Sequence, residues 1–240
     1  MIYSELGRCP LIMQRKLKIM KYWCKLLKVE NCILKSSYEY LRLDAENRVS
    51  SCMNWALDVK RELFSLGLGE FWIKQEFINV PLFLTVYKSR IWDIHIQECH
   101  SFFENSSKCF LYKHIVNHDF GIMQPYLRKP IQNNIRKHIS RIRLSSHCLN
   151  VEIGRYQNKN RQDRLCESCT TQQIEDEFHF VRQCPKYVQL RKKYLNVYYY
   201  KSPSTFKLLQ LLGSRHIPTL VGLGKYIQHA VMLRNKELSS

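Results

Sequence analysis

The sequence predicts a mainly α-helical fold, in which a helical domain is followed by a small segment with three cysteines and one histidine, and then by C-terminal helices. Apolar residues recur at a spacing of three or four over most of the chain. A hydrophobic content of 45% supplies a core, while 12% aromatic residues with only eight Gly and seven Pro argue against disorder. The expected divisions are residues 1–150, 151–197 and 198–240.

The first hundred residues contain several helical patterns. Residues 11–29 carry an apolar stripe with lysines and arginines largely off it, which is either a phosphate-binding or membrane-binding face or an ordinary solvated face. Residues 51–66 have helical spacing, and two glycines follow as stop signals. Residues 71–87 are rich in aromatic and β-branched residues, so they fit either a strand or a short buried helix. Residues 89–100 return to helical spacing.

Residues 120–151 contain no acidic residue. Isoleucines at helical spacing give this stretch one face that packs, and its basic residues project from the other faces. Ion pairs between residues four apart are impossible within it. Two interpretations stay open: the stretch contacts nucleic acid, or acids elsewhere in the fold, such as those at 175–177, neutralise it.

The net charge points to a polyanionic partner. The chain has 38 Lys and Arg against 20 Asp and Glu, a formal charge of +18. RNA or DNA is the expected partner, and an anionic membrane surface is the competing one. Eight residues are the predicted phosphate contacts: Arg128, Lys129, Arg136, Lys137, Arg141, Arg143, Arg155 and Arg161.

The rest of the chain alternates turn signals with helical patterns. Residues 152–161 are polar and turn-prone, which predicts a linker. Helices are expected over residues 185–194, where proline opens the helix, over residues 202–213, where glycine ends it, and over about residues 219–238.

Three of the ten cysteines cluster with one histidine in the pattern Cys166-x2-Cys169-x9-His179-x4-Cys184. Four thiol and imidazole ligands at this spacing are typical of a closed, tetrahedral, structural zinc site. His179 falls about one turn into a helix with an acidic start. Cys184 lies about 140° further round an ideal helix. Pro185 is therefore expected to bend the chain and to turn Cys184 back towards the metal.

One structural Zn²⁺ is the expected cofactor, and three basic residues flank the site. Arg164, Arg182 and Lys186 would favour the thiolate form that metal binding requires. The alternatives are three buried cysteines beside a core histidine, a catalytic metal site with an open position, or a redox Cys-x-x-Cys pair. The other seven cysteines stand singly among apolar residues and are expected to behave as small hydrophobes: Cys9, Cys24, Cys32, Cys52, Cys99, Cys109 and Cys148.

The expected location is the nucleus or the cytoplasm, with reduced thiols. The first residues lack the charged-then-apolar order of a secretory signal, so secretion is not expected. No apolar run has the length of a membrane span, so no transmembrane segment is expected.

Four short stretches carry a family resemblance, at residues 151–156, 164–169, 174–180 and 184–191. They read Val-Glu-Ile-Gly-Arg-Tyr, Arg-Leu-Cys-Glu-Ser-Cys, Ile-Glu-Asp-Glu-Phe-His-Phe, and Cys-Pro-Lys-Tyr with Leu-Arg following. Together they resemble the C-terminal zinc-binding region of non-LTR (LINE-type) retrotransposon reverse transcriptases of animals. Weaker similarities lie further upstream, at residues 5–11, 21–23 and 54–60.

The resemblance implies a zinc-stabilised module that binds the RNA of a retroelement or its target DNA, with a retroelement polymerase as a further partner. It implies Cys166, Cys169, His179 and Cys184 as the zinc ligands. Polymerase activity does not carry over, because the chain has no Tyr/Phe-x-Asp-Asp turn and no Asp-Asp pair at all. The chain is therefore expected not to be an enzyme. The alternative is a zinc-folded structural or protein-interaction remnant with no nucleic-acid role.

Overall fold

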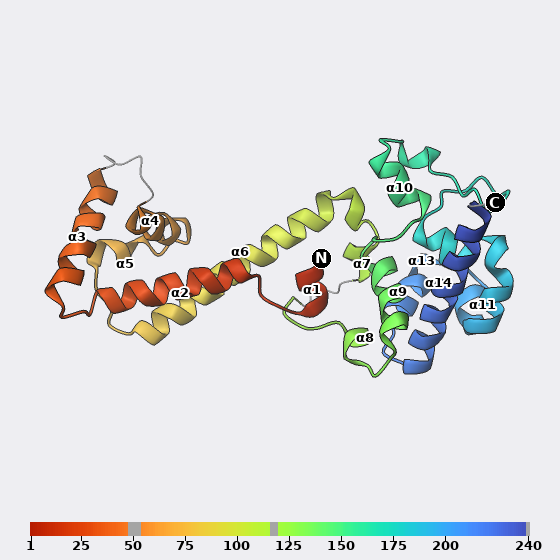
Figure 1. Ribbon diagram of the computed structural model, residues 1–240. Coiled ribbons are helices and arrows are strands. Elements are labelled where there is room, and N and C mark those ends of the chain that lie inside the picture. The colour runs from red at the N-terminus through yellow and green to blue at the C-terminus, as the bar shows by residue number, and fades with distance from the viewer. Residues whose placement is uncertain (48–53, 116–119, 239–240) are drawn as a thin grey trace. The chain divides into compact units, whose positions relative to one another are not determined.

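The computed structural model describes residues 1–47, 54–115 and 120–238 (Figure 1). Within these ranges the chain is mainly helical and has no named strand, so the predicted fold class is confirmed. The one β-type pairing there is an isolated antiparallel bridge between Leu165 and Ile174. Cys52 and the start of the helix expected over residues 51–66 lie outside the described residues.

The chain divides into two compact units. The helical unit comprises Cys9–His100, and the C-terminal unit comprises Met1–Arg8 together with Ser101–Ser240. This division differs from the three ranges expected from the sequence. Residues 101–150, the Cys/His segment and the last helices share a single hydrophobic core, which includes two of the cluster's own cysteines, Cys166 and Cys184.

The helical unit is built around aromatic side chains. Its helices are α2 (Leu11–Leu26), α3 (Cys32–Asn47), α4 (Trp55–Ser65), α5 (Gly69–Lys74) and most of α6 (Val80–Asn105). Trp23 is fully buried, stacks on Trp72 with ring centroids 6.2 Å apart, and donates a hydrogen bond from Nε1 to the Tyr38 hydroxyl at 2.8 Å. Asn54 caps α4 by accepting from the amides of Ala56 and Leu57.

The open choice between a strand and a helix over residues 71–87 is now decided. Residues 71–87 contain helices rather than a strand, because Trp72 on α5 and Phe83 and Tyr87 on α6 all bury into the same core. Phe83 and Tyr87 stand four residues apart, which places them on one helical face. Helix α3 was not expected, and only two of its residues, Tyr38 and Ala45, are buried.

The C-terminal unit consists of many short helices and one long one. In chain order they are α1 (Ile2–Leu6), η1 (Ser107–Cys109), α7 (Tyr112–Ile115), α8 (Pro125–Arg128), α9 (Asn133–Arg143), α10 (Asn150–Tyr156), η2 (Arg161–Asp163), η3 (His179–Gln183), η4 (Pro185–Tyr187), α11 (Val188–Tyr194), α12 (Val197–Tyr200), α13 (Thr205–Leu212) and α14 (Ile217–Leu238). The linker expected at 152–161 is corrected: α10 occupies its first half, because Val151 and Glu152 are buried.

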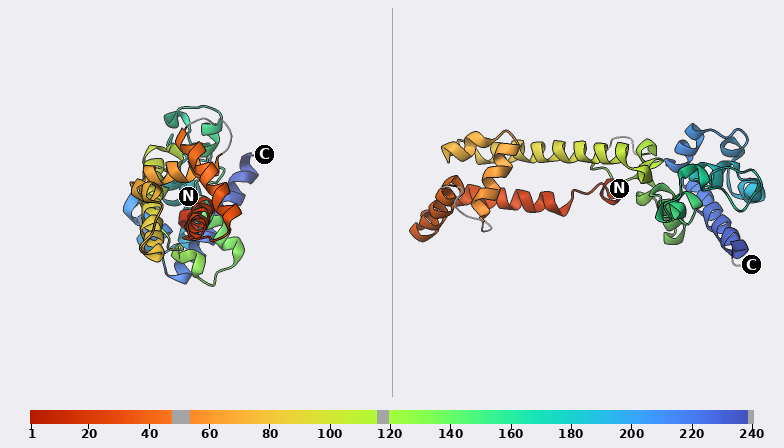
Figure 2. Two further views of the ribbon diagram at one scale, coloured as in Figure 1. Left: turned by 90° about the vertical axis from the view of Figure 1, so that its left-hand side faces the viewer. Right: turned by 90° about the horizontal axis from the view of Figure 1, so that it is seen from above.

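The long helix α14 contacts several other helices of this unit (Figure 2). It packs against both α9 and α11. Two glycines allow the close approach: a Cβ on Gly224 would overlap Ile135 of α9, and a Cβ on Gly222 would overlap the carbonyl oxygen of Tyr194. The isoleucines of α9 therefore lie directly against the backbone of α14.

A buried ion pair ties the N-terminal residues to the same unit. Arg143 at the end of α9 donates to the Glu5 carboxylate at 2.8 Å, and both side chains are almost fully buried. Arg143 also donates to the Leu212 carbonyl at 2.7 Å and to the Gln124 side chain at 2.9 Å. The guanidinium thus joins α1, α9 and the end of α13.

Candidate metal centre

A narrow loop positions the first two cysteines of the cluster. The amide of Cys166 donates to the carbonyl of Gln173 at 2.8 Å, and the amide of Glu175 donates to the carbonyl of Arg164 at 2.9 Å. These two bonds flank the Leu165–Ile174 bridge and close the loop. The Cys166–Cys169 turn is thereby held against the start of the helix that follows.

A π turn positions the other two ligands. Asp176 caps this turn by accepting from the amide of His179 at 2.9 Å. The amide of Cys184 then donates to the carbonyl of His179 at 2.7 Å, a bond that spans five residues. Because a π turn closes over five residues rather than four, Cys184 comes to lie nearly above His179. Cys184 itself lies outside helical geometry, with φ −48° and ψ 118°, as expected for a residue before proline.

The π turn refines the sequence-based expectation. An ordinary α-helix would separate His179 and Cys184 by about 140° and leave the correction to Pro185. In the structure a π turn precedes the proline, and its hydrogen bond over five residues already brings Cys184 back towards His179. Pro185 ends the turn and opens η4.

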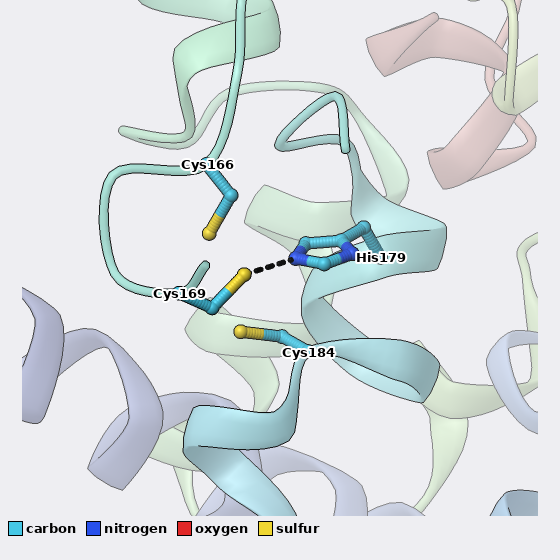
Figure 3. Close-up of side chains that lie close together, drawn as sticks. All are labelled: Cys166, Cys169, His179 and Cys184. Atoms are coloured by element: carbon cyan, nitrogen blue, oxygen red, sulfur yellow. Dashed lines mark hydrogen bonds between the residues drawn. The ribbon is translucent and has the colours of Figure 1, made fainter. Parts of the chain in front are cut away.

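The four predicted ligands converge (Figure 3). The ligand atoms of Cys166, Cys169, His179 and Cys184 all lie within 4.8 Å of one another, and Cys169 Sγ is 3.4 Å from His179 Nε2. All but Cys169 are buried. These residues therefore lie close enough to hold one metal ion.

Gln173 orients the histidine ring. His179 Nδ1 lies 2.8 Å from Gln173 Oε1, and since an amide oxygen only accepts, Nδ1 carries the proton. In the neutral ring Nε2 is then the unprotonated nitrogen, and it faces the sulfurs. A hydrogen bond to the second ring nitrogen is the usual way in which a metal-binding histidine is held. The spacing of the four ligands does not predict a role for Gln173. The one signal in the sequence is that Gln173 lies between the cysteine pair and the histidine.

Without a metal ion, hydrogen bonds among the cluster residues shift their pKa values. The hydrogen bond with Cys184, together with burial, raises the pKa of Cys166 to about 12, and the same bond lowers the pKa of Cys184. Burial alone would lower the pKa of His179, but its contacts with the Cys166 and Cys169 sulfurs outweigh burial and raise it. A metal ion bound here would displace these protons.

The basic residues that flank the cluster have mainly structural contacts. Arg164 donates to the carbonyls of Val151 and Lys159, both at 2.7 Å, and so braces the loop. Arg182 is buried and donates to the carbonyl of Ser202 at 3.2 Å. Arg191, which sequence reasoning missed, is also buried and donates to the carbonyl of Cys184 itself.

Four of the eight residues predicted to contact phosphate instead form ion pairs or hydrogen bonds within the protein. Arg143 must be withdrawn from the set, because it is buried in the ion pair with Glu5. Arg136 is half-buried and donates to the carbonyls of Lys129 and Ile131, where it holds the loop before α9.

The next two are paired near the Cys/His segment. Arg155 is paired with Glu152 at 2.9 Å. Arg161 is paired with Asp176 at 3.2 Å and lies over the ring of Phe110.

The other four predicted contacts are accessible. Arg128, Lys137 and Arg141 are exposed, Lys129 is half-buried, and none has an acidic partner in the part of the chain that the structure describes.

Of the acids at 175–177, only Glu177 forms an ion pair within residues 120–151, and its partner is His147 rather than a lysine or arginine. Glu175 binds Arg234 at 2.7 Å, Asp176 binds Arg161, and Glu177 binds His147 at 2.9 Å. The acids offered as internal counter-charges therefore leave Lys137 and Arg141 on the outer face of α9 unneutralised.

Two further findings bear on the class of protein. No helix in the described ranges is long and apolar enough to cross a membrane. Comparison of the chain with family models, with curated proteins and with solved structures finds no match.

Proposed function

We propose that the chain is a zinc-stabilised module that binds nucleic acid through the outer face of α9. The observation that carries the proposal is the convergence of three sulfurs and one imidazole nitrogen within 4.8 Å, in the same unit as an exposed cationic helix face. A site with four protein ligands holds a fold together, so the chemistry of the module lies in what its surface binds.

Zinc fits the ligand set better than other metals. Thiolate and imidazole are its usual ligands, and a tetrahedral ion with bonds of about 2.3 Å to sulfur and 2.0 Å to nitrogen places these atoms about 3.5–3.8 Å apart. The 3.4 Å between Cys169 Sγ and His179 Nε2 is close to that value. The Gln173 hydrogen bond leaves Nε2 as the coordinating nitrogen.

Nucleic acid is the partner that best explains the surface. Ile135, Ile139 and Ile142 anchor α9 in the core, while Lys137 and Arg141 are exposed. No acid occurs from residue 120 to residue 151, and the whole chain carries a formal charge of +18. An exposed cationic helix face of this kind is suited to phosphate contacts without base specificity.

The retrotransposon relationship is part of this proposal. It rests on the motif residues around the zinc ligands, and it makes the RNA or target DNA of a retroelement, together with its polymerase, the expected partners. A non-catalytic role in the nucleus or cytoplasm belongs to the same proposal.

Metal analysis tests the zinc site. We expect one zinc per native chain and none in Cys166→Ser or His179→Ala, measured by elemental analysis of purified protein. Cys109→Ser is the matched control, because Cys109 is a buried cysteine outside the cluster. Native protein that binds no zinc would contradict the proposal.

Charge reversal tests the nucleic-acid surface. We expect Lys137→Glu/Arg141→Glu to weaken binding of duplex DNA and RNA, and to reduce the salt dependence of log affinity by about 0.9 per lost DNA contact. Arg8→Glu/Lys159→Glu makes the same change in charge at exposed sites of the same unit and should have a much smaller effect. Equal affinities for the α9 variant and the native chain would favour the structural or protein-interaction alternative.

A further inference from the structure

A second acid-free stretch is longer than the one around α9. From residue 178 to residue 236 there is no Asp or Glu. The same stretch contains eleven basic residues: Arg182, Lys186, Arg191, Lys192, Lys193, Lys201, Lys207, Arg215, Lys225, Arg234 and Lys236. It covers η3 to α14 and so lies wholly in the C-terminal unit.

Lysines and tyrosines are in direct contact on this part of the surface. Lys207 of α13 has its ammonium 4.6 Å from the centre of the Tyr198 ring. Lys193 lies 5.2 Å from the centre of the Tyr194 ring. The positive charge is thus placed beside aromatic rings rather than beside carboxylates.

Tyr198 differs from its neighbours. Tyr194, Tyr199 and Tyr200 are partly buried and pack against the hydrophobic core, which accounts for their presence. Tyr198 is 46% exposed and does not pack against that core. Its ring meets Tyr199 edge to face, with centroids 5.2 Å apart, which fixes its position.

A buried cation lies in the element beneath. Helix α12, which carries Tyr198, packs on η3, which carries Arg182. Arg182 is 1% exposed, its Nε and Nη1 have no hydrogen-bond partner, and its one bond is to the carbonyl of Ser202. Its charge therefore adds to that of Lys207 and of the exposed Lys201 without a carboxylate to offset it in the described residues.

We propose that Tyr198, Lys201 and Lys207 form a binding site for single-stranded nucleic acid, in which an unpaired base stacks on Tyr198 and the lysines bind the adjacent phosphates. A fixed, exposed aromatic ring beside lysines is the combination that single-strand-binding proteins use. A duplex does not offer a free base face to the ring, so the site selects single strands. The class of partner rests on the proposed function, but the residues are separate from those of α9.

Binding of fluorescently labelled single-stranded and duplex oligonucleotides to the full chain tests the site. Tyr198→Ala should weaken binding of a single strand roughly tenfold, as expected for the loss of one base stack. Its affinity for duplex should stay within about twofold of native. Tyr198→Phe, which keeps the ring, should bind like the native chain. Lys207→Gln should reduce the salt slope for a single strand by about 0.7.

Tyr156→Ala is the matched control, because Tyr156 is 79% exposed on α10 of the same unit. Native single-strand affinity in both Tyr198→Ala and Lys207→Gln would overturn the site. If in that case the α9 variant still loses duplex binding, the proposed function survives. The reverse pattern, in which only the Tyr198 and Lys207 variants lose binding, supports this site and removes α9 from the interface.

Discussion

Arg143 belongs to the interior because of its phase on α9. It stands four residues after Ile139 and eight after Ile135, which places all three on one helical face. A basic residue on an apolar face needs a buried counter-charge, and Glu5 supplies it from a position 138 residues away. The sequence therefore contained the sign that Arg143 is not a surface residue, while its partner was not foreseeable.

We expect Glu5→Ala to destabilise the C-terminal unit by about 3–5 kcal/mol, because it leaves the buried Arg143 guanidinium without its carboxylate. Chemical denaturation monitored by circular dichroism measures the change in unfolding free energy. Asp163→Ala, at an exposed acid of the same unit, should change the unfolding free energy by less than about 0.5 kcal/mol. Similar values for the two variants would show that the ion pair contributes little.

Gln173 holds the ring of His179, so its substitution is expected to change the affinity of the proposed zinc site rather than its metal stoichiometry. Gln173→Ala should weaken zinc binding about 10- to 100-fold, because the ring loses the bond that fixes its orientation. Competition with a zinc chelator of known affinity measures this. Gln173→Glu keeps an acceptor and should retain most of the affinity, and Gln162→Ala is the exposed control. Native affinity in Gln173→Ala would mean that the ring is held by packing alone.

At the scale of the element, the close packing of α14 against α9 requires a residue without a side chain at position 224. Gly224→Ala should destabilise the unit by about 1–3 kcal/mol, although alanine is the better helix former, because the added Cβ overlaps Ile135. Chemical denaturation measures the unfolding free energy of this variant. Met232→Ala is the control for an alanine placed at an exposed position of α14. Ile135→Leu removes the methyl nearest to Gly224 and should partly restore the stability of Gly224→Ala. A stabilising effect of Gly224→Ala alone would contradict the tight packing.

The elements with a strong helical period were predictable, and those set by tertiary contacts were not. Helices α2 and α14 lie within two residues of at least one expected end, and α9 lies inside the stretch whose isoleucines have helical spacing, since the apolar spacing of all three is regular. The π turn of η3 was not predictable, because periodicity does not distinguish a hydrogen bond over five residues from one over four. The spacing of the three cysteines and the histidine was enough to predict that they cluster. The contacts of Gln173 with His179 and of Arg191 with Cys184 were not predictable, because they exist only in the folded chain.

At the scale of the molecule, the metal cluster and the tryptophans lie in different units. All four tryptophans, Trp23, Trp55, Trp72 and Trp92, belong to the helical unit, and the four metal ligands belong to the C-terminal unit. Cys166 and Cys184 are members of the C-terminal hydrophobic core, so we expect the loss of the proposed zinc ion to disturb that core. Tryptophan fluorescence therefore reports on the helical unit alone, whereas helical circular dichroism sums the helices of both units.

Removal of zinc by a chelator is accordingly expected to unfold one unit and spare the other. Helical circular dichroism should fall, because the binding free energy of a structural zinc is part of the folding free energy of the unit that holds it. Tryptophan emission should stay unchanged, since Trp23 and Trp72 lie buried in a separate core. Cys166→Ser should reproduce the chelated state without any chelator, and zinc added back should restore the native chain only. A red shift of tryptophan emission in step with the dichroism would show that the two units unfold together, and an unchanged dichroism would show that the metal does not hold the C-terminal unit folded.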